Sequence, residues 1–503
     1  MREPDVLVVG GGAAGMACAA TVRELGGRVL LVSKEPIGIA DTKISTGLFA
    51  VPDHPDAFLD DIQRSGEGLV DESLARTLAA EAEDAHRFLE DAGVRARSPS
   101  GARTKLRLPM GGHSAARSVS HSGGGRSLSA ALLRTLHGCT VWDDAWVTAF
   151  DEGNVAVWHA RSGEQVRIKP RAVVLATGGL CALYAPHADV MRSSTGDGYA
   201  LALRAGASLV DMEQVQFTPF GFVRPRRAIG LPMGEGVLAG PRGVLRDASG
   251  VFATDLASKG RAEIAALIAS RRDVVLDLRD NRCDELWNEE FRLRFRHVLR
   301  AVRRHYGVAA ARFEEPWPVL PTAHYHMGGI RTDVHGATEV PGLFAVGQAM
   351  GGVHGANRLG STSLPTAIVF GRRAARAALE SAPLRAISQP SAPPDPLRWT
   401  RRLQAAAWRG IGPLRDRASM ESALRCVEEA RAQSVPIAIR GAWDTEAMQA
   451  LELHGLLDSA EAIARSGLAR RRSLGAHCRR DSRAQDEIAA PIVTRIEHGR
   501  IVA

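Results

Sequence analysis

Hydrophobic residues in this chain first occur as short uninterrupted runs that lead into glycine. The run DVLVV covers residues 5–9, and the small apolar residues of GGGAAGMACAATVREL continue to Leu25. Similar runs are RVLLVS at 28–33, RAVVLATGG at 171–179 and VPGLFAVGQAMGG at 340–352. Continuous apolar runs of this length predict strands buried on both faces, as in a parallel sheet, and the stretch after the first run predicts a helix.

The turn between the first strand and the first helix has a dinucleotide-binding pattern. Its glycines have G-x-G-x-x-G spacing, in which the first permits a tight turn, the second lets the backbone approach a pyrophosphate and the third brings the helix close to the strand. Free N–H groups at the helix start face the phosphates. The second strand ends where a ribose-binding residue is expected. The residues expected to contact the dinucleotide here are Gly10, Gly12, Ala13, Ala14, Gly15, Ser33, Lys34 and Glu35.

The later strands favour FAD over NAD as the dinucleotide. An NAD domain normally completes its strands in one continuous stretch, whereas here strands at 171–179 and 340–352 rejoin the sheet much later in the chain. This interrupted order is typical of the FAD-binding domain of flavoprotein oxidoreductases. The sequence therefore predicts an α/β fold with a Rossmann-like FAD-binding domain.

A single arginine stands in the polar loop HGANRLG at 354–360, directly before an apolar stretch that has helical character. A guanidinium pairs best with a planar carboxylate or a phosphate. Arg358 is therefore a candidate for holding an anionic ligand.

Charge and cysteine content narrow the possible partners. The 503-residue chain has a formal charge of +8, but its basic residues are almost all scattered arginines. The one basic cluster, at 468–481, is interpreted as a solvated helix end rather than an RNA-binding site, so no nucleic-acid partner is expected. The six cysteines form no CxxC pair, which argues against zinc and iron-sulfur sites, and no metal is assigned.

The cellular location is expected to be the cytoplasm. Unpaired, widely spaced cysteines fit a reducing compartment. The N-terminus has no signal-peptide pattern, and no apolar run reaches the roughly 18 residues that a membrane span needs.

Several motifs together resemble the flavoprotein subunits of succinate dehydrogenase and fumarate reductase, a family that includes L-aspartate oxidase. They occur in the family's order along nearly the whole chain, and GGHSAAR at 111–117 is most similar to L-aspartate oxidase. The motifs are DVLVVGGGAAGMA, GGHSAAR, VVLATGG, STGDGYALALRAGA, DMEQVQF, HYHMGG, GLFAVGQ, HGANRLGSTSL and SLGAHCRRD.

The resemblance implies roles for residues around a substrate. Arg358 would grip a substrate carboxylate beside the flavin, and His324 of HYHMGG would be a second contact or carry a proton. Arg261 would be the proton donor, although Lys259 is a competing alignment. Three further residues are expected to shape the far side of the substrate: Thr218, His113 and Arg117.

Three positions depart from the family pattern. Thr218 replaces a carboxylate-binding histidine, and Met110 replaces an acidic residue that would suit a substrate ammonium. The loop LAGPRG at 238–243 lacks the relay glutamate, although Glu235 lies nearby. These changes leave the aspartate substrate and the proton route open.

The family also implies further contacts to FAD. Gln348 replaces the usual ribityl-binding glutamate, and the histidine that carries covalent flavin in respiratory subunits is absent near Asp41 and Thr42, so noncovalent FAD is expected. Asp197 could contact the cofactor or cap a helix that starts at Tyr199. The remaining expected contacts are Thr42, Ala176, Thr177, Gly178, Ser363 and Leu364.

The implied architecture adds an inserted α+β capping domain and a C-terminal helical bundle. Residues 386–398 are rich in proline and are interpreted as part of a linker. The expected segments are the first part of the FAD-binding domain (1–220), the capping domain (221–320), the second part of the FAD-binding domain (321–382), the linker (383–398) and the helical domain with its tail (399–503).

The expected function is FAD-dependent hydride transfer to or from a small carboxylate or amino acid. L-aspartate oxidation to iminoaspartate, with oxygen or another electron acceptor, is the nearest named reaction, and an altered substrate is the main variant. The alternative is a flavoprotein subunit of fumarate reductase or succinate dehydrogenase type that passes electrons to an iron-sulfur partner.

Overall fold

A five-stranded parallel sheet lies at the centre of the computed structural model, which describes residues 3–98, 104–482 and 489–503. Its strand order, β19-β10-β1-β2-β6, brings together segments from three distant parts of the chain. The strands are β1 (Val6–Val9), β2 (Val29–Val32), β6 (Thr140–Trp142), β10 (Ala172–Leu175) and β19 (Leu343–Ala345). The apolar runs that predict buried strands therefore form the sheet, together with β6.

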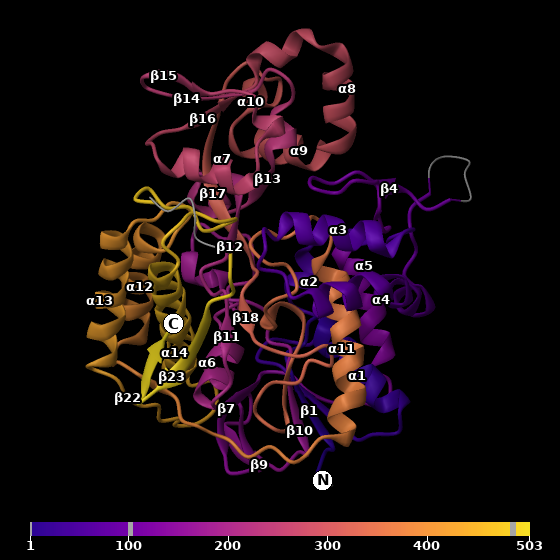
Figure 1. Ribbon diagram of the computed structural model, residues 1–503, viewed down its shortest axis with the longest axis vertical. Coiled ribbons are helices and arrows are strands. Elements are labelled where there is room, and N and C mark those ends of the chain that lie inside the picture. Colours follow the sequence, from indigo (N-terminus) through magenta and orange to yellow (C-terminus); the bar gives the residue numbers. More distant parts are fainter. Residues whose placement is uncertain (1–2, 99–103, 483–488) are drawn as a thin grey trace.

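Glycines allow the first strand and helix to pack closely. Gly10 has a φ of +117°, and a side chain there would overlap the carbonyl group of Ala176 at the end of β10. A side chain on Gly15 would overlap the carbonyl oxygen of Gly10. Helix α1 (Ala13–Glu24) consequently starts directly at the carboxyl end of β1, and it packs against α11 (Ser363–Glu380) (Figure 1).

Two antiparallel sheets accompany the central sheet. In one, β20 continues a meander of three strands, and in the other the C-terminal hairpin pairs with β11. The first comprises β7 (Ala145–Asp151), β8 (Asn154–His159), β9 (Glu164–Ile168) and β20 (Ile387–Ser388). The second comprises β11 (Leu209–Val210), β18 (Gly329–Ile330), β23 (Val493–Glu497) and β24 (Arg500–Val502).

A cap forms the top of the molecule in Figure 1. It is built on β12 (Val215–Phe222) and β17 (Trp317–His326), which pair antiparallel in a six-stranded sheet. Its other elements are β13 (Pro232–Gly234), β14 (Val244–Asp247), β15 (Gly250–Ala253), β16 (Val275–Asp277), α7 (Arg261–Ala269), α8 (Glu285–Arg294), α9 (Arg296–His305) and α10 (Val308–Ala311). Buried aromatic side chains, among them Phe291, Phe313 and Trp317, form a separate core in the cap.

The expected domain boundaries at 220/221 and 320/321 fall inside β12 and β17. These strands pair with each other, so the two connections between the cap and the rest of the molecule run side by side. The division of the chain into five segments stays a prediction.

The C-terminal region is helical, as its periodicity predicts. Its helices are α12 (Pro396–Gly410), α13 (Arg417–Arg431) and α14 (Thr445–Ala469). The proline-rich segment before them differs from a free linker, because β20 pairs with β7 and β21 (Ser391–Ala392) pairs with β22 (Val435–Pro436). Backbone pairing thus holds this segment against the body of the molecule.

The remaining helices and strands surround the central sheet. They are α2 (Asp41–Ile44), α3 (Pro55–Ser65), α4 (Glu72–Asp91), α5 (Gly124–Thr135), α6 (Asp197–Arg204), β3 (Phe49–Ala50), β4 (Arg107–Leu108) and β5 (Ser118–Val119). Within the described ranges, no helix combines the length and the apolar character needed to cross a bilayer.

Candidate functional site

A cavity of about 730 Å³ extends from the carboxyl end of the parallel sheet to the cap. Fifteen of the sixteen residues predicted to contact the cofactor line it. They are Gly10, Gly12, Ala13, Ala14, Ser33, Lys34, Glu35, Thr42, Ala176, Thr177, Gly178, Asp197, Gln348, Ser363 and Leu364. Gly15, the remaining residue, packs α1 against the turn instead.

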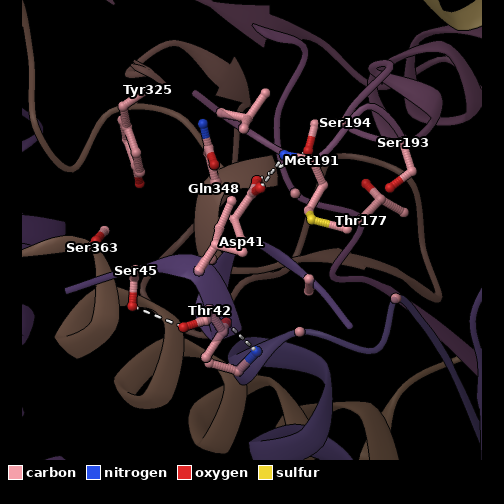
Figure 2. A pocket seen from close by; sticks show the side chains of 18 of the residues that line it. Asp41, Thr42, Ser45, Thr177, Met191, Ser193, Ser194, Tyr325, Gln348 and Ser363 are labelled. Carbon is pink, nitrogen blue, oxygen red and sulfur yellow. Dashed lines mark hydrogen bonds between the residues drawn. The ribbon is translucent and has the colours of Figure 1, made fainter. Parts of the chain in front are cut away.

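The start of α1 leaves space for a ligand. A side chain added at Gly12 would meet the Ala40 Cβ only at 3.6 Å, which is ordinary contact distance. Thr42 orients the turn, because its Oγ1 accepts a hydrogen bond from the Ala13 N–H at 3.0 Å (Figure 2). The backbone at Gly12 is therefore accessible to a phosphate-bearing ligand, as the glycine spacing predicts.

Gln348 presents an unsatisfied donor at the cavity. Its Nε2 is buried and has no hydrogen-bond partner in the described part of the chain. The Tyr199 hydroxyl donates to the Gln348 carbonyl at 2.8 Å and fixes the backbone at this position. A buried N–H without an acceptor is costly, so a ligand oxygen or nitrogen would satisfy it.

Lys34 and Asp197 form an ion pair on the cavity wall. The Lys34 Nζ lies 2.7 Å from Asp197 Oδ2 and 3.2 Å from Glu452 Oε1. Burial lowers the pKa of Lys34, but the two carboxylates outweigh it and raise the pKa overall. Helix α6 begins at Asp197 and not at Tyr199, because Asp197 already has helical geometry and Gly196 precedes it in the left-handed region.

Arg358 is buried at the opposite end of the cavity, where only 5% of the residue is exposed. Its Nη2 donates to Gln216 Oε1 at 3.1 Å, and Gln216 Nε2 donates back to the Arg358 carbonyl at 3.1 Å. The Tyr325 ring lies 4.6 Å from the guanidinium carbon. These contacts fix the guanidinium, while its buried Nε has no partner in the described chain.

Arg358 remains a cation at neutral pH. Burial and the nearby Arg261 lower its pKa to about 10. The incomplete hydrogen bonding and the retained charge together make Arg358 a binding group for an anion.

His324 and Asp189 form a second polar pair in the cavity. The Nδ1 of His324 lies 2.8 Å from Asp189 Oδ2. Asp189 holds the imidazole by this nitrogen, so the opposite nitrogen, Nε2, is available to a ligand. His324 and its neighbour Tyr325 both line the cavity from strand β17.

Arg261 pairs with Glu235. In the sequence, Glu235 lies shortly before the loop at 238–243, which lacks the relay glutamate. The Arg261 Nη2 lies 2.9 Å from Glu235 Oε1, and Glu235 lines the cavity. Burial raises the pKa of Glu235, but Arg261, His324 and Arg358 lower it overall. Lys259, the competing residue, pairs instead with Glu263 at an exposed position.

The three residues expected on the far side of the substrate occupy different environments. Thr218 lines the cavity from β12, whereas His113 and Arg117 do not line it. Arg117 is ion-paired with buried Asp61, and His113 Nε2 lies 2.8 Å from the Gly360 carbonyl oxygen. Their expected contact with substrate stays a prediction, and the contact of His113 with Gly360 connects it to the loop after Arg358.

Several cavity residues have no clear signal in the sequence. Asp189 and His297 stand alone in unremarkable segments, and Leu451, His454 and Gly455 belong to α14. Only the tertiary arrangement brings them to the site. Tyr325 is the exception, because it lies between the two histidines of HYHMGG.

The cavity fits FAD in its polar groups. Gln348 Nε2 requires an acceptor, Gly12 leaves room for a pyrophosphate, and the first turn of α11 at Ser363 faces the same space (Figure 2). The helix starts supply N–H groups and positive dipole ends where FAD carries phosphates and pyrimidine oxygens. A two-part parallel sheet, this cavity and a cap with paired ionisable residues define an FAD-binding oxidoreductase.

Comparison with protein-family models gives the same class. A model described as FAD binding domain matches residues 5–364, and one described as fumarate reductase flavoprotein C-term matches residues 400–496. The chain belongs to the flavoprotein family of succinate dehydrogenase and fumarate reductase, and it is an FAD-dependent oxidoreductase.

Curated relatives carry two different names. One of the chains of fumarate reductase (CoM/CoB) from Methanothermobacter marburgensis is 31% identical, and the match covers 96% of this chain and 95% of that protein. L-aspartate oxidase of Streptomyces coelicolor is 36% identical, and the match covers 74% of this chain and 67% of that protein. The names alone do not separate the two activities.

Solved structures show the same fold over the whole chain. Sdh1 of Mycobacterium smegmatis, in complex with UQ1, has a TM-score of 0.86 at 27% identity and covers 99% of this chain and 93% of its own. The FrdA chain of quinol fumarate reductase from E. coli has a TM-score of 0.83 at 25% identity and covers 99% of this chain and 96% of its own.

Proposed function

We propose that this protein transfers a hydride between FAD and a small carboxylate that has no ammonium group, with fumarate and succinate as the first candidates. The observation that carries the proposal is the pairing of charges near Arg358. Glu235 is engaged by Arg261 and Asp189 by His324, while Arg358 keeps a buried unpaired Nε. The site thus offers binding groups for an anion, and no free carboxylate for an ammonium among the described residues that surround Arg358.

Met110 supports this choice of substrate. It lines the cavity, and its side chain lies against Gly360, two residues after Arg358. A thioether cannot neutralise an ammonium group, which would lose hydration without gaining a partner. A substrate without that group avoids this cost.

The side chains orient the substrate and move its proton. Gln216 and Tyr325 fix the plane of the Arg358 guanidinium, and this guanidinium would hold one carboxylate of the substrate. His324 would donate from Nε2 to the same end of the substrate, and Asp189 keeps its ring in place. Arg261 would exchange a proton with a substrate carbon, and Glu235 would return that proton from solvent, since about a third of its side chain is exposed.

FAD, when bound noncovalently, would supply the N5 atom that accepts or gives the hydride. The residues that would hold it are those around Gly12, Thr42, Gln348 and Ser363. A cytoplasmic location and the identity of the electron acceptor, whether oxygen or an iron-sulfur partner, stay predictions.

L-aspartate oxidation is the second candidate, because relatives with that name share about a third of their residues with this chain. An L-aspartate substrate would need Glu235 or Asp189 to leave its present partner and face the ammonium. The two candidates therefore differ in a measurable way.

The test follows the flavin absorbance of the purified protein without oxygen. Succinate should bleach the flavin band, and fumarate should restore it in dithionite-reduced protein, while L-aspartate leaves the oxidised band unchanged. Bleaching by L-aspartate but not by succinate would reverse the choice between the candidates. No response to any of the three would refute both.

A further inference from the structure

Asp41 presents a carboxylate to the cavity from the start of α2. Its Oδ1 accepts a hydrogen bond from the Met191 N–H at 2.6 Å (Figure 2), and its Oδ2 accepts one from the Ser194 hydroxyl at 3.0 Å. Both donors are uncharged, and no lysine or arginine of the described ranges forms an ion pair with Asp41. The carboxylate is therefore fixed at the cavity wall without a bonded counter-ion.

The contacts around Asp41 place it between the two ends of the cavity. The hydroxyl of Thr42, the next residue, accepts a hydrogen bond from the first N–H of α1, where the phosphates of FAD would bind. The segment 189–194, which bonds the Asp41 carboxylate, reaches the substrate end, because its first residue lies 2.8 Å from Nδ1 of His324. The redox-active ring of FAD is attached to the phosphates and must meet the substrate. Asp41 consequently lines the part of the cavity that this ring would occupy.

The charge of Asp41 is unfavourable in its surroundings. Burial and the nearby Asp189 raise the pKa of Asp41, and they outweigh the two hydrogen bonds and His324, which lower it. Reduction of FAD adds two electrons and one or two protons, so the ring gains electron density and carries a negative charge when it takes up only one proton. A fixed carboxylate beside the ring opposes this gain.

We propose that the Asp41 carboxylate lowers the reduction potential of bound FAD and thereby makes the reduced cofactor a stronger electron donor. In terms of binding, the carboxylate weakens the affinity for reduced FAD more than the affinity for oxidised FAD. Asp41 would then favour reduction of a substrate over its oxidation. The proposal requires bound FAD but no particular substrate, so its test is independent of the choice between fumarate and L-aspartate.

The experiment measures the midpoint potential of the FAD-loaded protein. Dithionite reduces the flavin without oxygen at pH 8, in the presence of a reference dye, and absorbance gives the oxidised fraction of each. The variants are Asp41→Asn, which removes the charge, and Asp41→Glu, which keeps it. Asp143→Asn is the matched control, because the Asp143 carboxylate also accepts a backbone N–H, that of Ile37, but does not line the cavity.

Asp41→Asn should lower the ratio of the dissociation constants of reduced and oxidised FAD by at least about tenfold, as expected for two charges within several Å of each other in a protein. For a two-electron couple, this change raises the midpoint potential by about 30 mV or more. Asp41→Glu should retain most of the low potential, and Asp143→Asn should leave it unchanged. An unchanged or lower potential in Asp41→Asn, or an equal rise in Asp41→Glu or in Asp143→Asn, would overturn the proposal.

Asp41→Ser is a second neutral variant for the case that Asp41→Asn does not fold. Circular dichroism and titration of oxidised FAD into each apoprotein monitor folding and cofactor affinity. The neutral variants should still bind oxidised FAD, because the proposed effect of the charge is directed against the reduced form. If neither neutral variant folds and binds oxidised FAD, Asp41 serves to hold the structure or the cofactor, and the proposal is wrong.

Discussion

Arg358 combines burial, a fixed guanidinium and an unused donor, and lysine cannot reproduce this combination. The Arg358→Lys variant keeps the charge but loses the planar pair of donors that fits a carboxylate. We expect kcat/KM for fumarate reduction to fall by about 100-fold to 1,000-fold, the range found when one preorganised donor is removed from an active site. The measurement is stopped-flow reoxidation of the reduced flavin.

The flavin content of Arg358→Lys should remain unchanged, since Arg358 is proposed to hold the substrate and not FAD. Arg331→Lys is the matched control, because Arg331 is exposed and forms only a long 4.0 Å ion pair with Glu339. Comparable losses of activity in both variants would argue against a specific role for Arg358.

A second prediction concerns Gln348 and the affinity for the cofactor. Removing its side chain in Gln348→Ala deletes the buried Nε2 donor that lacks a partner in the described chain. If FAD satisfies this donor, its dissociation constant should rise by about tenfold. Titration of FAD into the apoprotein, followed by quenching of flavin fluorescence, gives this constant.

Gln433→Ala serves as the control for Gln348→Ala, since Gln433 is exposed just after α13 and its side chain donates to the Glu429 carbonyl of that helix. Acid precipitation should release the flavin from the unmodified protein, as noncovalent binding requires. An unaltered affinity in Gln348→Ala would mean that Nε2 does not contact the cofactor.

Sequence could predict the individual residues that stand in local motifs, but not their pairings. Arg358, His324 and Thr218 stand in short recognisable stretches, and all three line the cavity. The ion pair between Arg261 and Glu235 depends on how α7 packs beside the end of β13, which no local pattern specifies. For the same reason, the pairing of Arg117 with Asp61 could not be anticipated.

The turn between β1 and α1 has one glycine that serves the fold and one that serves the ligand. Gly10 needs its positive φ and close approach to β10, whereas Gly12 has an extended backbone and an open face. We therefore expect Gly12→Val to fold with little change in thermal stability and to lose at least about 100-fold in FAD affinity, because the added methyl groups occupy the space of the pyrophosphate. Circular dichroism and FAD titration test the two statements separately.

Gly10→Ala is the variant to compare with Gly12→Val. It should lower the melting temperature of the protein even without FAD. If Gly12→Val retained normal FAD affinity, the phosphates would have to bind elsewhere in the cavity.

Sequence patterns predict the main elements around the central sheet well, because buried strands and the helices that follow them have strong local signals. The expected strands at 5–9, 28–33 and 171–179 all occur in the sheet. The role of α14 could not be predicted. Its helical pattern does not indicate that Glu452 of this helix contacts Lys34, which lies 418 residues earlier in the sequence. Long-range packing, not local propensity, decides that contact.

A buried charge network joins the C-terminal region to the rest of the molecule. Arg470 after α14 lies 2.6 Å from Glu213 Oε1 and 3.0 Å from Asp211 Oδ1. The Ile492 N–H donates to Asp211 Oδ1 at 2.9 Å, so the strand pair of the C-terminal hairpin is tied to the same carboxylate. Burial and neighbouring Glu213 raise the pKa of Asp211 to about 8, although Arg470 opposes the shift.

Because of this raised pKa, the free energy of unfolding should decrease as the pH rises. The folded protein binds the Asp211 proton more tightly than the unfolded chain, so the resulting stabilisation is fully present below the ordinary pKa of 3.8 and is lost as pH rises through about 8. Asp211→Asn has no such proton. Between pH 5 and pH 8, the free energy of unfolding of the unmodified protein should therefore fall by on the order of 2 to 4 kcal/mol relative to that of Asp211→Asn.

Urea denaturation of both proteins across this pH range measures the difference. Asp60→Asn is the control, since Asp60 is exposed. Parallel stability curves for the unmodified protein and Asp211→Asn would contradict the assignment of a raised pKa to Asp211.

The wall formed by α14 also sets an order on biosynthesis. Leu451, His454 and Gly455 line the cavity, and Glu452 fixes Lys34 from the same helix. When only the residues before Thr445 have been translated, the nascent chain contains the parallel sheet, the glycine turn and Arg358, but it lacks α14. The complete cofactor cavity therefore forms only after α14 (Thr445–Ala469) has been synthesised, so a cofactor that arrives earlier lacks the contacts of this wall.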